Sequence, residues 1–378
     1  MTKSIFVSSI FLSTVFPCSK FMKTKLVELD PIKPDSQILK RAGKILKNGG
    51  LVAFPTETVY GLGANGLDEE AARKTYLAKG RPSDNPLIIH IAKLEDLSAI
   101  TKNLPVAAEG LARHFWPGPF TMIFEKSELV PYGTTGGLET VAVRIPENEI
   151  ARKLILAAGG YVSAPSANIS GKPSPTNARH VIEDLAGKIE MVLDGGQVSI
   201  GIESTILDMT VTPPMILRPG RITKEMIEDV IGPVETAEPM SGKDDQIAPK
   251  APGMKYRHYA PEGALQIVKG EPLQEVAAIK YLVHEKIAAG YKVGIIASDE
   301  TFSFYTEGII KNLGGRNDEE EIGRNLYRIL REFNEEKVAY IYSESFPGQG
   351  FGEAIRNRLD KAAGQAYLSA GEFLTDNI

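Results

Sequence analysis

The chain has little capacity for cysteine chemistry. Cys18 is the one cysteine among its 378 residues, which excludes an intramolecular disulfide and a cysteine-rich zinc site. A single thiol is also typical of proteins from reducing compartments. The five histidines lack the spacing of zinc ligands, and no segment after residue 22 approaches the ~20 apolar residues that span a bilayer. We therefore expect a cytoplasmic protein without a membrane span and without a metal held by its own side chains.

The chain also lacks an excess of positive charge. Its 43 Lys and Arg residues stand against 48 Asp and Glu residues, for a formal net charge of −5. Broad, non-specific nucleic-acid binding usually needs a basic excess, so direct nucleic-acid binding is expected to be weak or indirect. The length is sufficient for two domains, and the hydrophobic fraction of 43% is ordinary for a globular protein.

The common nucleotide-binding and nucleophile motifs are missing as well. The sequence contains no P-loop, and no G-x-G-x-x-G follows a strand and opens a helix. Gly348-Gln-Gly-Phe-Gly352 has the wrong spacing for a phosphate loop and is interpreted as a structural turn. No Ser-His-Asp or Cys-His set is suggested. Any chemistry must therefore come from other polar segments.

The pattern of apolar residues divides the chain into four parts. Residues 1–22 are either a signal-like extension, because an apolar run follows Lys3, or a mis-called extension before a natural start at Met22, which we favour. Residues 23–231 predict an α/β sheet domain, 232–263 a linker rich in Pro, Gly and charge, and 264–378 a smaller βαβ-type domain.

The predicted helices and strands alternate within both domains. Helices are predicted at 36–47, 68–79, 273–289, 319–334 and 352–363. Strands are predicted at 51–54, 87–91, 121–124, 141–145, 161–164, 191–194, 204–208, 264–268, 292–297 and 338–342. Residues 55–63, dense in hydroxyls and glycine, are predicted to form a loop.

The segment Lys79-Gly-Arg81-Pro-Ser-Asp-Asn85 is the richest candidate for chemistry. Lys79 and Arg81 just beyond a helix suit a polyphosphate, because Arg presents a planar fork of donors and Lys a mobile charge. Prolines on either side of Asn85 stiffen the loop. The alternative is an ordinary solvated helix end. His90, at the end of an apolar strand, is by itself more typical of a core histidine than of a ligand.

Further polar segments also follow apolar strands. Residues 163–176 present hydroxyls, Asn and Gly between prolines, which suits an anion, although a plain exposed Ser/Pro connection would have the same composition. Residues 201–208 form another cluster, and Arg144 and Arg218 each end an apolar run. Open α/β sheets bind ligands at such strand ends.

The motifs together closely resemble the YrdC-like family of threonylcarbamoyl-AMP synthases. They are Pro55-Thr-Glu-Thr-Val-Tyr-Gly-Leu-Gly63, Lys79-Gly-Arg81-Pro-Ser-Asp-Asn85-Pro-Leu87, Phe115-Trp-Pro-Gly-Pro119, Ala164-Pro-Ser-Ala-Asn168-Ile-Ser-Gly-Lys-Pro173 and Gly201-Ile-Glu-Ser-Thr205. The linker Ala251-Pro-Gly-Met-Lys-Tyr-Arg-His-Tyr-Ala-Pro261 resembles that of the family's two-domain form. The resemblance covers nearly everything from residue 23 onward, and five motifs in order are specific where each alone is not.

The resemblance implies a fold and a reaction. The fold is a twisted, open α/β sheet with a positively lined cavity, followed by a smaller Rossmann-like domain, with the linker crossing the mouth of the active site. The reaction joins L-threonine, bicarbonate or CO2 and ATP into threonylcarbamoyl-AMP and diphosphate. That product then supplies tRNA-modifying partner proteins in the first step of threonylcarbamoyladenosine formation. Mg²⁺ is expected with the triphosphate.

The resemblance also implies the site residues, motif by motif. Lys79 and Arg81 are expected to be catalytic and to face the phosphates. The other expected ATP contacts are Asn85, Thr140, Ser166, Ser174 and Arg218, with Tyr256 and His258 from the linker. The expected threonine contacts are Thr58, His90, Arg144, Ala164 through its backbone, and Ser204.

Two other functions remain open from the sequence. The cationic cavity could hold structured RNA, with the second domain as a platform for partners, although the acidic net charge disfavours this. The chain could also be an ATP-dependent carbamoyl or adenylyl transferase with another acceptor. Such enzymes carry zinc-finger-like or acylphosphatase-like segments, which are missing from this sequence.

Overall fold

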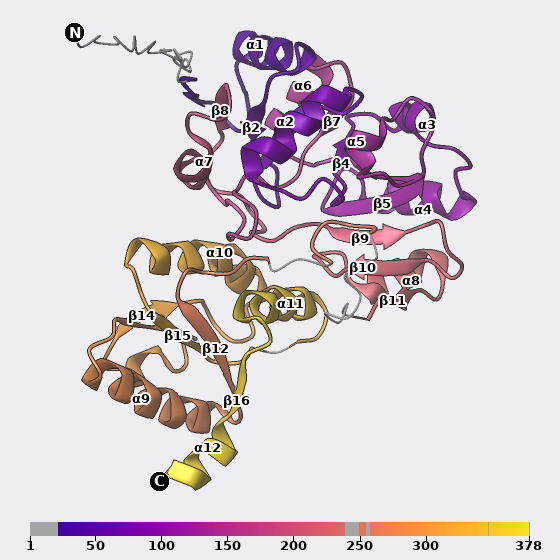
Figure 1. Cartoon of the computed structure of the whole chain (residues 1–378). Coiled ribbons are helices and arrows are strands. Elements are labelled where there is room, and N and C mark those ends of the chain that lie inside the picture. Colours follow the sequence, from indigo (N-terminus) through magenta and orange to yellow (C-terminus); the bar gives the residue numbers. More distant parts are fainter. Residues whose placement is uncertain (1–21, 239–248, 255–257, 347, 378) are drawn as a thin grey trace, which may run out of the picture.

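The computed structural model describes residues 22–238, 249–254, 258–346 and 348–377 (Figure 1). Two α/β bodies follow one another along the chain, one for each predicted domain. Cys18, Tyr256 and nearly all of the N-terminal extension lie outside the described residues. In the described part, no helix is both long enough and apolar enough to cross a bilayer.

The first domain is built on a mixed sheet of 11 described strands, in the order β1-β8-β2-β3-β7-β4-β6-β5-β9-β10-β11. The strands are β1 (Lys25–Glu28), β2 (Val52–Phe54), β3 (Gly61–Asn65), β4 (Ile88–His90), β5 (Phe120–Glu125), β6 (Thr140–Arg144), β7 (Val162–Ser163), β8 (Met191–Asp194), β9 (Thr205–Asp208), β10 (Met215–Arg218) and β11 (Glu235–Thr236). The helices are α1 (Ser36–Lys47), α2 (Glu69–Lys79), α3 (Leu97–Ile100), α4 (Val106–Phe115), α5 (Tyr132–Thr135), α6 (Glu149–Ala157), α7 (Ala178–Leu185) and α8 (Lys224–Ile231), with the 3₁₀ turn η1 (Leu94–Asp96).

The first two predicted helices of this domain, α1 and α2, begin and end at capping residues. The side chain of Asp35 accepts hydrogen bonds from the first turn of α1, whose face with Leu39 and Leu46 is buried. Asp68 begins α2 in the same way. Gly80 ends α2 in the left-handed conformation at φ 60°, which costs glycine no steric strain. That sharp stop turns the chain from Lys79 directly into Arg81.

The predicted loop over residues 55–63 is shorter than expected. Gly61 begins β3, which pairs antiparallel with β2, so Phe54 lies opposite Gly61. A Cβ atom on Gly63 would lie 2.9 Å from the Phe54 ring and 3.0 Å from the Val52 carbonyl. Both glycines belong to β3. At Gly63, only a residue without a side chain allows the Phe54 ring to lie this close to the strand. The prediction took them for turn residues and was wrong there.

The second domain holds a parallel sheet of five described strands in the order β14-β13-β15-β12-β16. Its strands are β12 (Ala264–Lys269), β13 (Val293–Ala297), β14 (Ile309–Asn312), β15 (Tyr340–Ser343) and β16 (Tyr367–Ser369). Its helices are α9 (Pro272–Ala288), α10 (Glu319–Glu335), α11 (Phe351–Ala363) and α12 (Ala370–Asn377), with the 3₁₀ turn η2 (Phe302–Phe304). Separate apolar clusters lie under α10 and α11 and under α9 and α12, so helices cover both faces. The predicted strands do not include β1, β10, β11, β14 or β16, and the predicted helices do not include α3 to α8 or α12.

The two domains are joined by a common apolar cluster and by a buried ion pair. Val59, Ile202 and Tyr259 pack into the same apolar cluster as Tyr327 of α10. Arg331 of α10 donates to Asp184 at 2.7 Å across the interface. The second domain therefore packs directly on the first as well as following it in the chain.

Candidate active site

A pocket that is partly open to solvent lies where the predicted polar segments meet. Eleven of the predicted site residues line it: Thr58, Lys79, Arg81, His90, Arg144, Ala164, Ser166, Ser174, Ser204, Arg218 and His258. Asn85 and Thr140 are described but are not part of the lining, and Tyr256 is outside the described residues. The wall combines strand ends and loops of the first domain with the segment around Pro252 and His258.

Lys79 and Arg81 are buried, with 2% and 8% of their surface exposed, which excludes the solvated helix end considered from the sequence. The Lys79 ammonium donates to the carbonyls of Ser166 and Asn168, both at 2.5 Å. Burial, and secondly the charge of Arg81, lower the pKa of Lys79 well below its ordinary range. Lys79 therefore fixes the Ser166 loop while its charge stays poorly compensated.

Arg81 is oriented by Asn85, the neighbouring residue that was also predicted to contact ATP. Its guanidinium donates to the Asn85 carbonyl at 3.1 Å, to the Asn85 side-chain oxygen at 2.6 Å and to the Pro86 carbonyl at 3.0 Å. The stiff proline-flanked loop thus holds Arg81 in place, and Asn85 contacts the arginine instead of lining the pocket.

Arg144 has an acidic neighbour that the sequence reasoning did not single out. Its Nη2 lies 2.6 Å from Glu57 Oε1 in a buried ion pair, although the pair lacks hydrogen-bond geometry. Nη1 donates to the Thr58 hydroxyl at 3.0 Å and Nε to the Gly118 carbonyl at 3.1 Å. Glu57 lies between two threonines in the first motif. That position was the signal from which the sequence could have identified it as a site residue.

His90 lies beside Arg144 because β4 and β6 are parallel neighbours that pair these two residues. The ring is buried, and its Nδ1 is 3.2 Å from the Ile88 carbonyl. Burial, and then the charge of Arg144, lower the pKa of His90 to about 3. The imidazole is therefore neutral at physiological pH, and Arg144 is the cation at this end of the pocket.

Ser204 and Arg218 form one hydrogen-bonded unit across β9 and β10. Arg218 donates to the Ser204 carbonyl at 3.0 Å and to its hydroxyl at 3.1 Å. The Ser204 hydroxyl also lies 2.8 Å from that of Thr121. A third bond, 3.3 Å long, joins Arg218 to the Pro252 carbonyl in the predicted linker. The two residues assigned to different substrates are thus in direct contact.

Glu203 is a second wall residue that the sequence reasoning missed. The Ser174 hydroxyl donates to Oε1 at 2.6 Å, while Tyr327 and Arg358 of the second domain donate to Oε2 at 2.9 and 3.1 Å. Burial would raise the pKa of Glu203, but Arg358 and Arg218 outweigh it and lower the pKa to about 2. Glu203 is therefore a buried carboxylate that links Ser174 to the other domain.

The described part of the linker covers one side of the pocket. Lys361 of α11 donates to the Gly253 carbonyl at 2.7 Å, and the Ala260 amide donates to Gly171 at 3.0 Å. Tyr259 stacks on Tyr327 with ring centroids 5.1 Å apart. Burial, and then Arg81, lower the pKa of His258 to about 3. The site is therefore a cationic pocket with neutral histidines, closed partly by the linker.

Two family models match the chain. The Sua5/YciO/YrdC model, described as telomere recombination, matches residues 44–220. The model of the threonylcarbamoyl-AMP synthase C-terminal domain matches residues 222–364. Together they cover both predicted domains in the expected order.

Curated and solved relatives agree with these matches. A threonylcarbamoyl-AMP synthase of Pyrococcus abyssi is 50% identical over 87% of this chain and 95% of its own length. A threonylcarbamoyl-AMP synthase of Bacillus subtilis is 46% identical over 91% of this chain and 99% of its own length. The crystal structure of P. abyssi Sua5 complexed with L-threonine superposes with a TM-score of 0.86 at 46% identity, covering 92% of this chain and 99% of that one. The chain therefore belongs to the two-domain threonylcarbamoyl-AMP synthase family.

Proposed function

We infer that this protein is a threonylcarbamoyl-AMP synthase, a nucleotidyl-transferring enzyme that uses ATP. It joins L-threonine, bicarbonate or CO2 and ATP into threonylcarbamoyl-AMP and releases diphosphate, the first step of threonylcarbamoyladenosine formation in tRNA. High identity along nearly the whole of both chains supports this function. The observation that carries it at the level of the site is the meeting of four of the five motif regions around one cationic pocket, while the fifth, through the Gly118 carbonyl, accepts a hydrogen bond from Arg144.

The reaction needs positioning and charge stabilisation more than a protein nucleophile. The threonine amine attacks CO2 and loses a proton, which gives a carbamate. A carbamate oxygen then attacks the α-phosphorus of ATP, and the bond to the β-phosphate oxygen breaks as diphosphate leaves. Negative charge develops on the phosphates throughout, so fixed cations in a partly enclosed pocket stabilise the transition state. Lys79 and Arg81 supply such cations.

Threonine is assigned to the end of the pocket around Arg144. Its carboxylate pairs with the Arg144 guanidinium, where a planar fork of donors fits best. Thr58, which already accepts a hydrogen bond from Arg144, and neutral His90 lie on one side of it. The Ala164 backbone and the Ser204 hydroxyl complete this subsite.

ATP is assigned to the end around Lys79 and Arg81. An ammonium has three donors, and Lys79 spends two of them on carbonyls, so the third serves a phosphate oxygen. Asn85 acts on ATP through Arg81, which it orients. The remaining assigned contacts are Ser166, Ser174, Arg218 and His258. Thr140 and Tyr256 stay predicted contacts.

Mg²⁺ is proposed to enter as part of the nucleotide substrate, held by phosphate oxygens and water. The described residues contain no group of three or more His, Cys, Asp or Glu side chains that could hold a metal ion. We also propose that the product passes to tRNA-modifying partner proteins in the cytoplasm, with weak or indirect contact between this chain and tRNA.

Chromatographic separation of nucleotides after incubation with ATP, bicarbonate and L-threonine tests the function. The expected result is a new adenylate, with the mass of threonylcarbamoyl-AMP, that forms only when all three substrates are present. Formation of the adenylate without threonine would contradict the proposal. So would its absence from a folded protein that binds both ATP and threonine.

A further inference from the structure

A second cavity lies in the C-terminal domain, away from the site described above. It has a volume of about 210 Å³ and is partly open to solvent, and its walls are Ile267, Lys269, Ser345, Phe346, Arg356, Leu359 and Asp360. β12 ends at Lys269, and the chain reaches Ser345 just after β15 ends. The two strands are parallel neighbours, so the cavity opens at their carboxyl ends.

This is the edge at which open α/β sheets bind ligands. β12 leads through α9 to β13, whereas β15 leads through α11 to β16, and the two helices lie over separate apolar clusters. The connections therefore leave these neighbouring strands toward opposite faces of the sheet.

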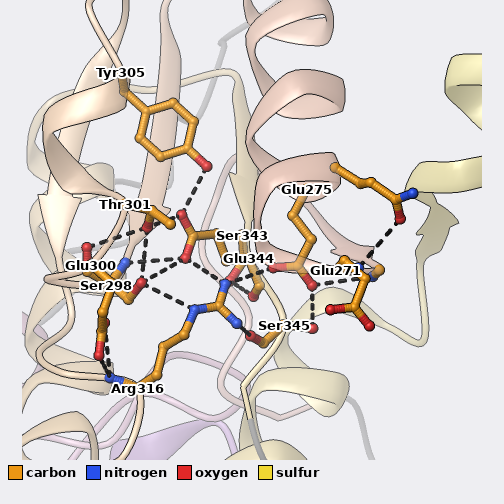
Figure 2. A network of polar contacts seen from close by, with 12 residues as sticks. Glu271, Glu275, Ser298, Glu300, Thr301, Tyr305, Arg316, Ser343, Glu344 and Ser345 are labelled. Carbon is orange, nitrogen blue, oxygen red and sulfur yellow. Dashed lines mark hydrogen bonds and ion pairs between the residues drawn. The ribbon is translucent and has the colours of Figure 1, made fainter.

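The carboxyl ends next to this cavity are closed by protein groups, as Figure 2 shows. Arg316 reaches between the buried carboxylates of Glu275 and Glu344, at 2.7 and 2.8 Å. The Ser298 amide and the Tyr305 hydroxyl also donate to Glu344. Every oxygen of the two carboxylates has a partner, so this part of the edge is a finished internal network with no group left to bind a ligand.

The cavity beside it differs because its charged groups are incompletely paired. The side chains of Lys269 and Arg356 are exposed. Among the described residues, neither has a carboxylate oxygen within 4.0 Å. Lys269 lies 3.4 Å over the Tyr367 ring. Arg356 is held against the loop before α11, since a Cβ on Gly348 would lie 2.2 Å from its Nη1. Two fixed cations at one opening suit an anion with two or more oxygens.

Asp360 is the acidic residue of the cavity wall. Its Oδ1 atom is buried, so a ligand does not reach this oxygen. Burial raises the pKa of Asp360, and Tyr367, Lys269 and Arg356 offset part of that rise. Ile267, Phe346 and Leu359 offer apolar contact to the carbon skeleton of a ligand.

We propose that the cavity between β12, β15 and α11 binds a small organic phosphate. Its phosphate contacts Lys269 and Arg356, and its carbon skeleton packs against Ile267, Phe346 and Leu359.

Helix α11 connects this site to the active-site pocket. Arg356 and Asp360 line the cavity, while Arg358 donates to Glu203 and Lys361 donates to the Gly253 carbonyl of the linker. Residues two apart on a helix point to opposite sides, so one helix carries both sets of contacts. A ligand that shifts α11 changes the wall and the cover of the catalytic pocket, which makes the cavity a regulatory site.

Isothermal titration calorimetry of the whole chain with ribose 5-phosphate tests the site. Saturating L-threonine and a non-hydrolysable ATP analogue occupy the active site during the titration. Wild type should bind with a dissociation constant below 1 mM, and Lys269→Gln/Arg356→Gln should weaken binding at least about tenfold. The matched control is Lys40→Gln/Lys44→Gln, which removes the same charge from exposed positions of α1 and should bind like wild type.

Each outcome decides part of the proposal. No binding by wild type, or equal binding by the cavity variant and the control, overturns the site. Unchanged substrate KM values without the probe show that the variants are folded. Ribose 5-phosphate should alter the KM for ATP in wild type, and a constant KM refutes the coupling through α11.

Discussion

Glu203 allows the structure to be tested through the pH dependence of stability. Its carboxylate is buried between Arg358, Tyr327 and Ser174, and its pKa falls from an ordinary 4.5 to about 2. At ~1.4 kcal/mol per pKa unit, the folded state gains about 3 kcal/mol from this ionised carboxylate. Because the folded pKa is lowered, the gain is complete above pH 4.5 and is lost as the pH falls toward 2.

Glu203→Gln keeps the shape of the side chain, removes its charge and leaves Arg358 as a buried cation without a carboxylate partner. We therefore expect a loss of about 3–5 kcal/mol in the free energy of unfolding at pH 7. Near pH 2 about half of the wild-type carboxyl is protonated and most of its contribution is lost, so the difference between the two proteins should become small. Urea unfolding followed by fluorescence of Trp116, the one tryptophan in the chain, measures both values.

The double variant Glu203→Gln/Arg358→Met provides the control. It removes the unpaired cation as well, so it should recover part of the lost stability. A difference between wild type and Glu203→Gln that stays constant from pH 7 to pH 2 would refute the electrostatic explanation. It would indicate that packing, not charge, joins the two domains here.

Four more predictions concern the pocket and the domain interface. Arg81→Ala should lower diphosphate release at least about 100-fold while the protein stays folded; normal turnover would remove its phosphate role. Ser204→Ala should raise the KM for threonine more than that for ATP, and equal increases would exclude it from the threonine subsite. Because the pKa of His90 is about 3, the pH–rate profile from 5 to 8 should contain no step that His90→Asn abolishes. Gly201→Ala should lower the urea midpoint more than Gly137→Ala, since both have positive φ but only Gly201 meets backbone of the second domain, at 2.2 Å; equal losses would attribute the effect to φ alone.

The sequence was sufficient where the information is local. Helix α1 begins and ends at the predicted residues, Ser36 and Lys47, because its apolar spacing and its caps all lie within about 15 residues. The polar segments after strands could be recognised for the same reason, and they do line one pocket. Glycine was ambiguous, since Gly61 and Gly63 occur in a strand beside Phe54 while the same residue type elsewhere ends helices.

The parts that the sequence did not predict depend on distant contacts. Glu203 and Arg358 are 155 residues apart, so nothing near Glu203 indicates that a second-domain arginine neutralises it. The pairing of Glu57 with Arg144 requires the loop after β2 to meet the end of β6 in space. The position of Asn85 outside the pocket follows from its bond to Arg81, which a motif match does not contain. Motifs predicted residues that line the pocket, whereas the contacts among them came from the fold.

Diphosphate release from ATP, measured with bicarbonate and with or without L-threonine, tests the central claim most directly. We predict release that depends on threonine and that serine or glycine at the same concentration does not support. Release that is independent of the amino acid would contradict the claim. So would the absence of release from a folded protein that binds tRNA, a result that would favour the RNA-binding alternative.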